Sequence, residues 1–199
     1  MKTAIIGGSF NPPHIGHIHL INQVLESTDF NRIILIPLHT PNHKSVKHEI
    51  DPRHRIAMVE LLAKNIPTGC IVDTCEIDRG GISYTYDTVK EIFDRYEDTS
   101  EVGVIIGDDL LPGLIEWNRF ELLKELASFL VIRREASSGN VLRQIEKIKE
   151  MGVSIELLTN KVVEVSSSEI RRRIEAFEDA SRLLPMNVVS YIQENELYR

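Results

Sequence analysis

Short apolar runs alternate with amphipathic stretches along almost the whole chain. Apolar runs of strand length predict β-strands at residues 3–7, 32–38, 70–76, 101–107, 128–133, 154–158 and 162–165. Stretches with helical spacing predict α-helices at residues 14–27, 85–96, 140–151, 167–177 and 185–195. Another helix is predicted to begin at residue 51, and a further helical stretch follows the fourth strand and ends at residue 126. Asp51 before Pro52 is a favourable helix start, because aspartate caps a helix and proline fits its first position.

The arrangement of these elements predicts the fold class. The strands are nearly continuous apolar runs, as expected for a sheet that helices cover on both faces. Their alternation with helices predicts an α/β fold with a doubly wound parallel sheet. No repeat, low-complexity segment or linker interrupts the pattern, so we expect residues 1–199 to form one domain, with C-terminal helices from about residue 167. In such folds, ligands bind at the carboxyl ends of the strands.

The loop after the first strand combines glycines with histidines: residues 7–17 read GGSFNPPHIGH. Two glycines let the backbone turn tightly, and the following helix offers unpaired N–H groups to a phosphate. His14 and His17 are three residues apart, so both rings should share one helix face, where a positive charge would oppose the helix dipole. We expect mostly neutral imidazoles that donate hydrogen bonds to phosphate. Incidental surface histidines and a shared metal ion are the alternatives.

A second helix start lies near the other end of the chain, where residues 166–173 read SSSEIRRR. The first serine and the glutamate make a capping-box pattern, and Ser167, Ser168 and Arg171 then share one helix face. Arginines in the opening turns oppose the helix dipole, which is easier to explain if an anion binds Arg171 there. We interpret the next two arginines as a solvated basic face. Both helix starts should converge at one sheet edge and hold a triphosphate.

The charge distribution agrees with an anion site near the N-terminus. The net charge of −7 argues against general binding to nucleic acid or to an anionic membrane. Residues 1–55 nevertheless hold six Lys/Arg against four Asp/Glu and contain all seven histidines. Cys70 and Cys75 are an odd number of residues apart in a predicted strand, so they should face opposite ways and not form a disulfide. No run approaches membrane-spanning length, and a reducing cytoplasmic location fits best.

These two motifs resemble the signatures of a known superfamily. Residues 14–17 resemble the T/HxGH signature, and residues 166–174 resemble the SSTxIRxRI signature, of the nucleotidyltransferases. The resemblance implies a Rossmann-like nucleotidyltransferase fold. The sequence HIGH also occurs in class I aminoacyl-tRNA synthetases, but the chain has no KMSKS sequence and its acidic charge does not suit a tRNA-binding domain.

Further segments resemble one family, the nicotinate-nucleotide adenylyltransferases. They are PLHTPNHK at residues 37–44, SYT at 83–85, GDDL at 107–110 with Trp117, and the tail at 189–198. The resemblance covers essentially the whole chain. It implies transfer of the adenylyl group of ATP to nicotinate mononucleotide, with Mg²⁺ accompanying ATP. The rival hypotheses are nicotinamide mononucleotide or another phosphorylated acceptor, and a non-catalytic nucleotide sensor; oligomeric state stays open, a homo-oligomer included.

The resemblance also assigns roles to residues of this chain. The predicted catalytic residues are His14, His17 and Arg171, which would also bind ATP, and the further predicted ATP contacts are Gly8, Ser9, Phe10, Gly107, Asp109, Arg133, Ser167 and Ser168. The predicted acceptor-binding residues are Lys44, Ser83, Tyr84, Thr85 and Trp117; no residue is predicted to ligate a metal. By itself, a lone tryptophan is more often a core residue than a ligand platform. The chain departs from the family at Asn11, where aspartate is also common, and at residues 133–135, where Arg-Arg-Glu replaces Arg-Pro-Gly and weakens the assignment of Arg133.

Overall fold

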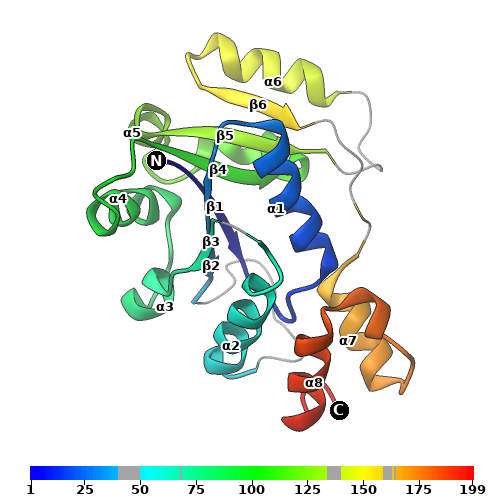
Figure 1. The fold of residues 1–199 in the computed structure, drawn as a ribbon. Helices are drawn as coiled ribbons and strands as arrows, with labels where there is room; N and C mark the ends of the chain where they lie inside the picture. Colours follow the sequence, from blue (N-terminus) through cyan, green and yellow to red (C-terminus); the bar gives the residue numbers. More distant parts are fainter. Residues whose placement is uncertain (40–49, 68, 134–139, 159–162, 164) are drawn as a thin grey trace.

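Six parallel strands form one sheet in the order β3-β2-β1-β4-β5-β6 (Figure 1). The computed structural model describes residues 1–39, 50–67, 69–133, 140–158, 163 and 165–199. The strands are β1 Lys2–Gly8, β2 Arg32–Pro37, β3 Cys70–Val72, β4 Glu101–Gly107, β5 Ala127–Ile132 and β6 Ile155–Leu158. From the central β1, the strand order runs outward in both directions, as in doubly wound nucleotide-binding sheets. The predicted fold class is confirmed.

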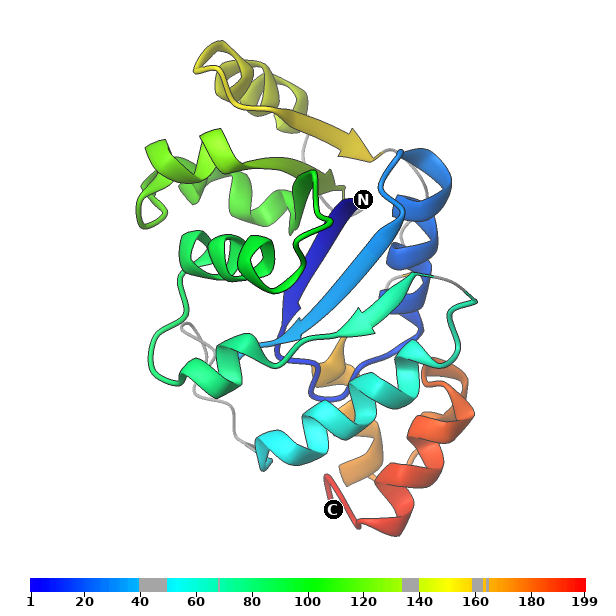
Figure 2. The same cartoon turned by 60° about the vertical axis from the view of Figure 1, so that its left-hand side comes forward.

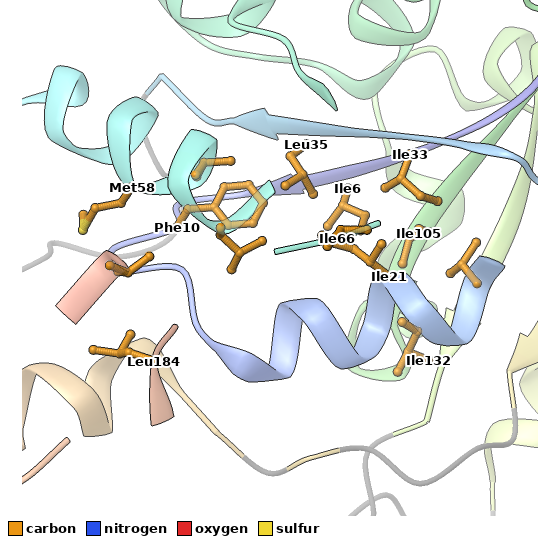
Figure 3. Packing of buried hydrophobic residues seen from close by; sticks show 14 of the residues in the cluster. Ile6, Phe10, Ile21, Ile33, Leu35, Met58, Ile66, Ile105, Ile132 and Leu184 are labelled. Carbon is orange, nitrogen blue, oxygen red and sulfur yellow. The ribbon is translucent and has the colours of Figure 1, made fainter. Parts of the chain in front are cut away.

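Helices cover both faces of this sheet (Figures 1 and 2). Along β1, Ile6 packs into one apolar cluster and its neighbour Ile5 into the other, because successive side chains of a strand point to opposite faces. Figure 3 shows the first cluster between the strands and α1. The helices of this layer are α1 Ile15–Ser27, α2 Pro52–Ala63, α7 Ser167–Glu175 and α8 Met186–Glu194. The other layer contains α3 Cys75–Arg79, α4 Thr85–Arg95, the 3₁₀ helix η1 Asp108–Glu116, α5 Phe120–Leu126 and α6 Val141–Glu150.

The third predicted strand is too long. The strand stops at Val72, and Cys75, predicted to lie in it, begins α3. The Asp73 carboxylate accepts a hydrogen bond from the Cys75 N–H at 2.8 Å, which turns the chain into a helix. Both Cys70 and Cys75 are unpaired, as predicted. The reason differs from the predicted one, because the two cysteines lie in different elements, β3 and α3, and not on two faces of one strand.

Two other predictions change in detail. The helical stretch after β4 is a 3₁₀ helix, η1, that contains Pro112 and is followed by the separate helix α5. Of the predicted strand at residues 162–165, the residues that the structure describes, Val163 and Val165, lie outside any strand. A short 3₁₀ helix, η2 (Ser181–Leu183), precedes α8. Within the described residues, no helix has the length and apolar character that crossing a membrane requires.

Candidate active site

The carboxyl ends of the central strands open into a cavity of about 800 Å³. This volume is in the range of small-molecule sites. The predicted site residues that line it are Ser9, His14, His17, Gly107, Asp109, Ser167, Ser168 and Arg171. They come from the end of β1, the start of α1, the end of β4 and the start of α7. The two helix starts predicted to converge therefore do so, although they are separated by nearly the whole chain.

The two histidines form a compact pair at the start of α1. His14 is the N-cap residue, and its backbone N–H donates to Nδ1 of His17 at 3.0 Å. The ring centroids lie 3.9 Å apart. Since Nδ1 of the neutral His17 ring accepts a hydrogen bond, its proton is on Nε2. His17 thus has a second ring nitrogen able to donate to a ligand.

Burial keeps both imidazoles neutral. It lowers the pKa of His14 to about 3, with the neighbouring His17 adding to the shift, and it lowers the pKa of His17 to about 4. The predicted neutral state therefore has burial, and not the helix dipole, as its main cause. Nδ1 of His14 is buried and has no hydrogen-bond partner among the described residues. Two neutral rings can donate hydrogen bonds without themselves neutralising a phosphate.

Gly16 leaves room for the His14 ring beside the start of α1. A Cβ at this position would lie 3.0 Å from Nδ1 of His14 and 3.4 Å from the backbone oxygen of Val163. Such contacts would force the ring or the neighbouring segment to move. Packing around the His14 ring therefore favours glycine at this position.

Helix α7 is hydrogen-bonded directly to the loop that precedes α1. Oγ of Ser167 donates to the backbone oxygen of Pro12 at 2.8 Å, and Nη1 of Arg171 donates to that of Asn11 at 2.7 Å. Nη2 of Arg171 donates to Oγ of Ser168 at 3.1 Å. Nε of Arg171 is buried without a partner in the described part of the chain. This guanidinium joins the two motifs and contributes a positive charge to the cavity wall.

Only half of the capping box predicted at α7 is formed. Oγ of Ser166 accepts a hydrogen bond from the Glu169 N–H at 3.2 Å, so the serine caps the helix. The Glu169 carboxylate instead accepts hydrogen bonds from Arg172 and Arg173, at 2.7 to 2.9 Å. Arg172 is exposed and Arg173 is partly buried, and both are paired with Glu169, which agrees with their interpretation as a surface feature.

Some predicted ATP contacts do not line the cavity. The Phe10 side chain is 1% exposed and belongs to the apolar core (Figure 3). Its ring centroid lies 4.9 Å from that of His17. Gly8 lies against this ring, since a Cβ on Gly8 would be 3.2 Å from it. Arg133 is exposed just beyond β5. These three residues therefore lie outside the cavity lining, and the Phe10 ring packs against the ring of His17.

The predicted acceptor-binding residues form a separate group. Ser83, Tyr84 and Thr85 lie at the start of α4, and Trp117 follows η1; none of them lines the cavity. Trp117 packs edge-on against Phe129 at 6.3 Å, as a partly buried neighbour of the core.

The two acceptor segments are nevertheless linked. Nη1 of Arg119 lies 3.4 Å from Oδ1 of Asp87, and its guanidinium is 5.2 Å from the centre of the Tyr86 ring. The start of α4 is therefore connected to the segment that follows Trp117. Lys44, the remaining predicted residue, lies outside the described residues.

Arg55 is a residue of the cavity wall that the sequence analysis missed. Its side chain is buried, and it donates to the backbone oxygens of Ser9 at 3.1 Å, Leu38 at 2.7 Å and His39 at 3.2 Å. It thereby ties the loop after β1 to the loop after β2. A signal was present: Arg55 is in helical register with the buried residues Met58, Val59 and Leu62, so it is an arginine on an apolar helix face.

A Rossmann-like sheet on which the starts of α1 and α7 bring the predicted phosphate-binding groups to one cavity defines a nucleotidyltransferase. Comparison with known families agrees: the sequence model of the family described as Cytidylyltransferase-like matches residues 5–173. That match includes residues 14–17 of the first motif and residues 166–173 of the second.

Closer relatives narrow this class. A probable nicotinate-nucleotide adenylyltransferase of Borrelia hermsii is 36% identical, over 100% of this chain and 98% of the relative. One of Streptococcus pyogenes is 32% identical, over 100% of this chain and 89% of the relative. The chain belongs to the nicotinate-nucleotide adenylyltransferase family.

A solved structure supports the fold independently. The nicotinic acid mononucleotide adenylyltransferase of Plasmodium falciparum, complexed with NaAD, matches with a TM-score of 0.77. The match covers 100% of this chain and 98% of that one, at 20% identity. At this identity the likeness concerns the fold.

Proposed function

We propose that the protein transfers the adenylyl group of ATP to nicotinate mononucleotide, forming nicotinic acid adenine dinucleotide and pyrophosphate in NAD biosynthesis. The observation that carries this proposal is the convergence of His14, His17 and Arg171 on one cavity of nucleotide size. The names of full-length relatives at 32 to 36% identity supply the substrate. The proposal takes residues 1–199 as one nucleotidyltransferase domain, because both motifs lie against the same sheet.

The reaction is an in-line displacement at the α-phosphorus of ATP. An oxygen of the acceptor's 5′-phosphate forms a bond to this phosphorus, and the bond to the bridging oxygen of pyrophosphate breaks. Such a reaction needs positioned reactants and stabilisation of charge more than a covalent enzyme group. The imidazoles of His14 and His17 donate to the reacting phosphates. Arg171, Ser167 and Ser168 hold the departing pyrophosphate.

The donor set of the cavity suits a divalent ion carried by ATP. The histidines are neutral, so the positive charges of Arg55 and Arg171 in the cavity wall offset only part of the charge of a triphosphate. Across the part of the chain that the structure describes, no group of three or more His, Cys, Asp or Glu side chains could hold a metal ion. We therefore propose Mg²⁺, bound mainly by phosphate oxygens and water, as the ion that neutralises developing charge.

The remaining predicted residues complete the proposed site. Backbone N–H groups at the start of α4, near Thr85, would hold the nicotinate carboxylate, because a helix N-terminus favours an anion. Trp117 is only partly buried and would stack on the pyridine ring. The residues left for the nucleoside and phosphates of ATP are Gly8, Ser9, Phe10, Gly107, Asp109 and Arg133. For Phe10, whose ring is buried, the contact would come from the backbone. The unpaired cysteines fit a cytoplasmic location.

A paired-acceptor assay tests this function. Pyrophosphate release is measured with ATP and Mg²⁺, once with nicotinate mononucleotide and once with nicotinamide mononucleotide. We expect clear preference for the acid, since the amide has no charge for the α4 N-terminus to bind. A preference for the amide would refute the substrate, and tight ATP binding without any turnover would establish a nucleotide sensor instead. His17→Asn, which lacks the proposed donor, serves as the inactive control.

A further inference from the structure

The C-terminal residues turn back toward the first motif. After α8, the Leu197 N–H donates to the Ile192 backbone oxygen at 3.0 Å. Glu196 and Tyr198 have φ angles of 50° and 64°, in the left-handed region that residues other than glycine rarely adopt. Such conformations persist where surrounding contacts fix them. The chain therefore ends in a specific conformation beside α7 and α8, visible near the C label in Figures 1 and 2.

This turn places a single hydroxyl group against the loop that precedes His14. The Tyr198 side chain is buried, and its Oη donates to Oδ1 of Asn11 at 2.6 Å. Burial raises the pKa of the Tyr198 phenol, so the hydroxyl remains a donor at neutral pH. This contact joins residues that are 187 positions apart in the sequence.

Asn11 is the point at which the C-terminus meets the proposed catalytic groups. It is 4% exposed and lines the cavity. Its side-chain oxygen accepts from Tyr198, while its backbone oxygen accepts from Nη1 of Arg171. Three residues later the chain reaches His14, whose N–H positions the His17 ring. The hydroxyl of Tyr198 and the guanidinium of Arg171 thus both donate hydrogen bonds to the same short loop.

We propose that Tyr198 is a positioning residue for adenylyl transfer, whose hydroxyl fixes Asn11 and so keeps the loop before His14 in register with Arg171. The inference rests on the proposed function. It concerns the hydroxyl specifically, because the tyrosine ring alone would fill the same apolar volume. Removing the hydroxyl should therefore affect turnover more than folding, since catalytic donors must be placed within a fraction of an ångström.

Tyr198→Phe tests the role, with Tyr191→Phe as a matched control. Tyr191 is on α8, and its Oη is 2.9 Å from Nδ1 of His54 on α2, so the control also removes one hydroxyl hydrogen bond near the C-terminus. We expect Tyr198→Phe to lower kcat about tenfold, or about 1.4 kcal/mol, with KM for ATP within about twofold of the wild type. Tyr191→Phe should leave kcat unchanged while lowering Tm to a similar extent. Equal kcat values for the two variants would overturn the proposal.

Two further measurements separate this role from general stability and from the function itself. In the Asn11→Ala background, Tyr198→Phe should lower kcat no further; a full additional tenfold loss would show that Tyr198 does not act through Asn11. The NMR signals of the His14 and His17 rings should shift in Tyr198→Phe and not in Tyr191→Phe, and unchanged signals would contradict the proposal. If Tyr198→Phe shifts these signals as expected but the wild-type protein turns over no acceptor, the proposed function fails while the positional coupling stands.

Discussion

The most informative single position is His17, because its two ring nitrogens have different roles. Nδ1 accepts the backbone N–H of His14, and Nε2 carries the hydrogen that can be donated to phosphate. Replacing His17 by alanine removes both. The lost donor should lower kcat about 10²- to 10³-fold, equivalent to about 3 or 4 kcal/mol of transition-state stabilisation. The lost acceptor at the helix start should also cost about 1 kcal/mol of folding free energy.

Two substitutions separate these effects. Asparagine places an amide oxygen close to the position of Nδ1, so His17→Asn should keep the hydrogen bond from His14 and lack the phosphate donor. Glutamine places an amide nitrogen close to the position of Nε2, so His17→Gln should restore part of the donor and lose the acceptor. We expect the asparagine variant to be nearly as stable as wild type but as slow as His17→Ala, and the glutamine variant to be faster.

The assay is steady-state pyrophosphate release at saturating ATP and nicotinate mononucleotide, together with urea unfolding of each variant. The unfolding free energies show whether a loss of rate follows a loss of structure. If the kcat of His17→Asn is within about threefold of wild type, the lost transition-state stabilisation is only about 0.7 kcal/mol. Such a result would refute the role of Nε2. Equal kcat values for the alanine, asparagine and glutamine variants, despite unequal unfolding free energies, would refute the assignment of different roles to Nδ1 and Nε2.

Two more predictions follow from the burial of the site. The histidine pKa values are lowered in the folded state, so the unfolded chain binds more protons at mildly acidic pH; folding stability should be complete above about pH 6.5 and decrease as pH falls toward 4. Urea unfolding between pH 7.5 and 5 measures this loss, and His17→Asn should flatten the curve; an equally steep curve for that variant would contradict the assignment. Arg55→Met keeps most of the side-chain volume but leaves three backbone oxygens without their donor, so it should lower the unfolding free energy by about 2 kcal/mol or more and raise KM for ATP. Arg55→Lys should restore only part of both, because one ammonium cannot reach all three oxygens, and full recovery would show that charge alone is sufficient.

Element boundaries depended on interactions that are not visible in local apolar patterns. The continuous apolar runs and the glycine-rich turn were sufficient for the parallel sheet and for the helix start at His14. The run at residues 70–76 looked like one strand, yet the strand ends at Val72 and the Asp73 carboxylate accepts the N–H of Cys75, the first residue of α3. Likewise the glutamate of the predicted capping box has arginine partners one turn away, and these compete with the backbone N–H.

The sequence by itself determined the fold class, the two motifs and the type of chemistry, because strand and helix periodicity, glycine turns, a pair of histidines in one helix start and the serines and arginine in another are properties of short segments. Only the tertiary structure decided which atoms face the cavity and how the motifs are joined. The bonds from Arg171 and Tyr198 to Asn11 span 160 and 187 residues, and Arg55 holds loops from two strands. Such contacts depend on how the chain folds back on itself, and burial created in the same way is the main cause of the neutral state of the two histidines.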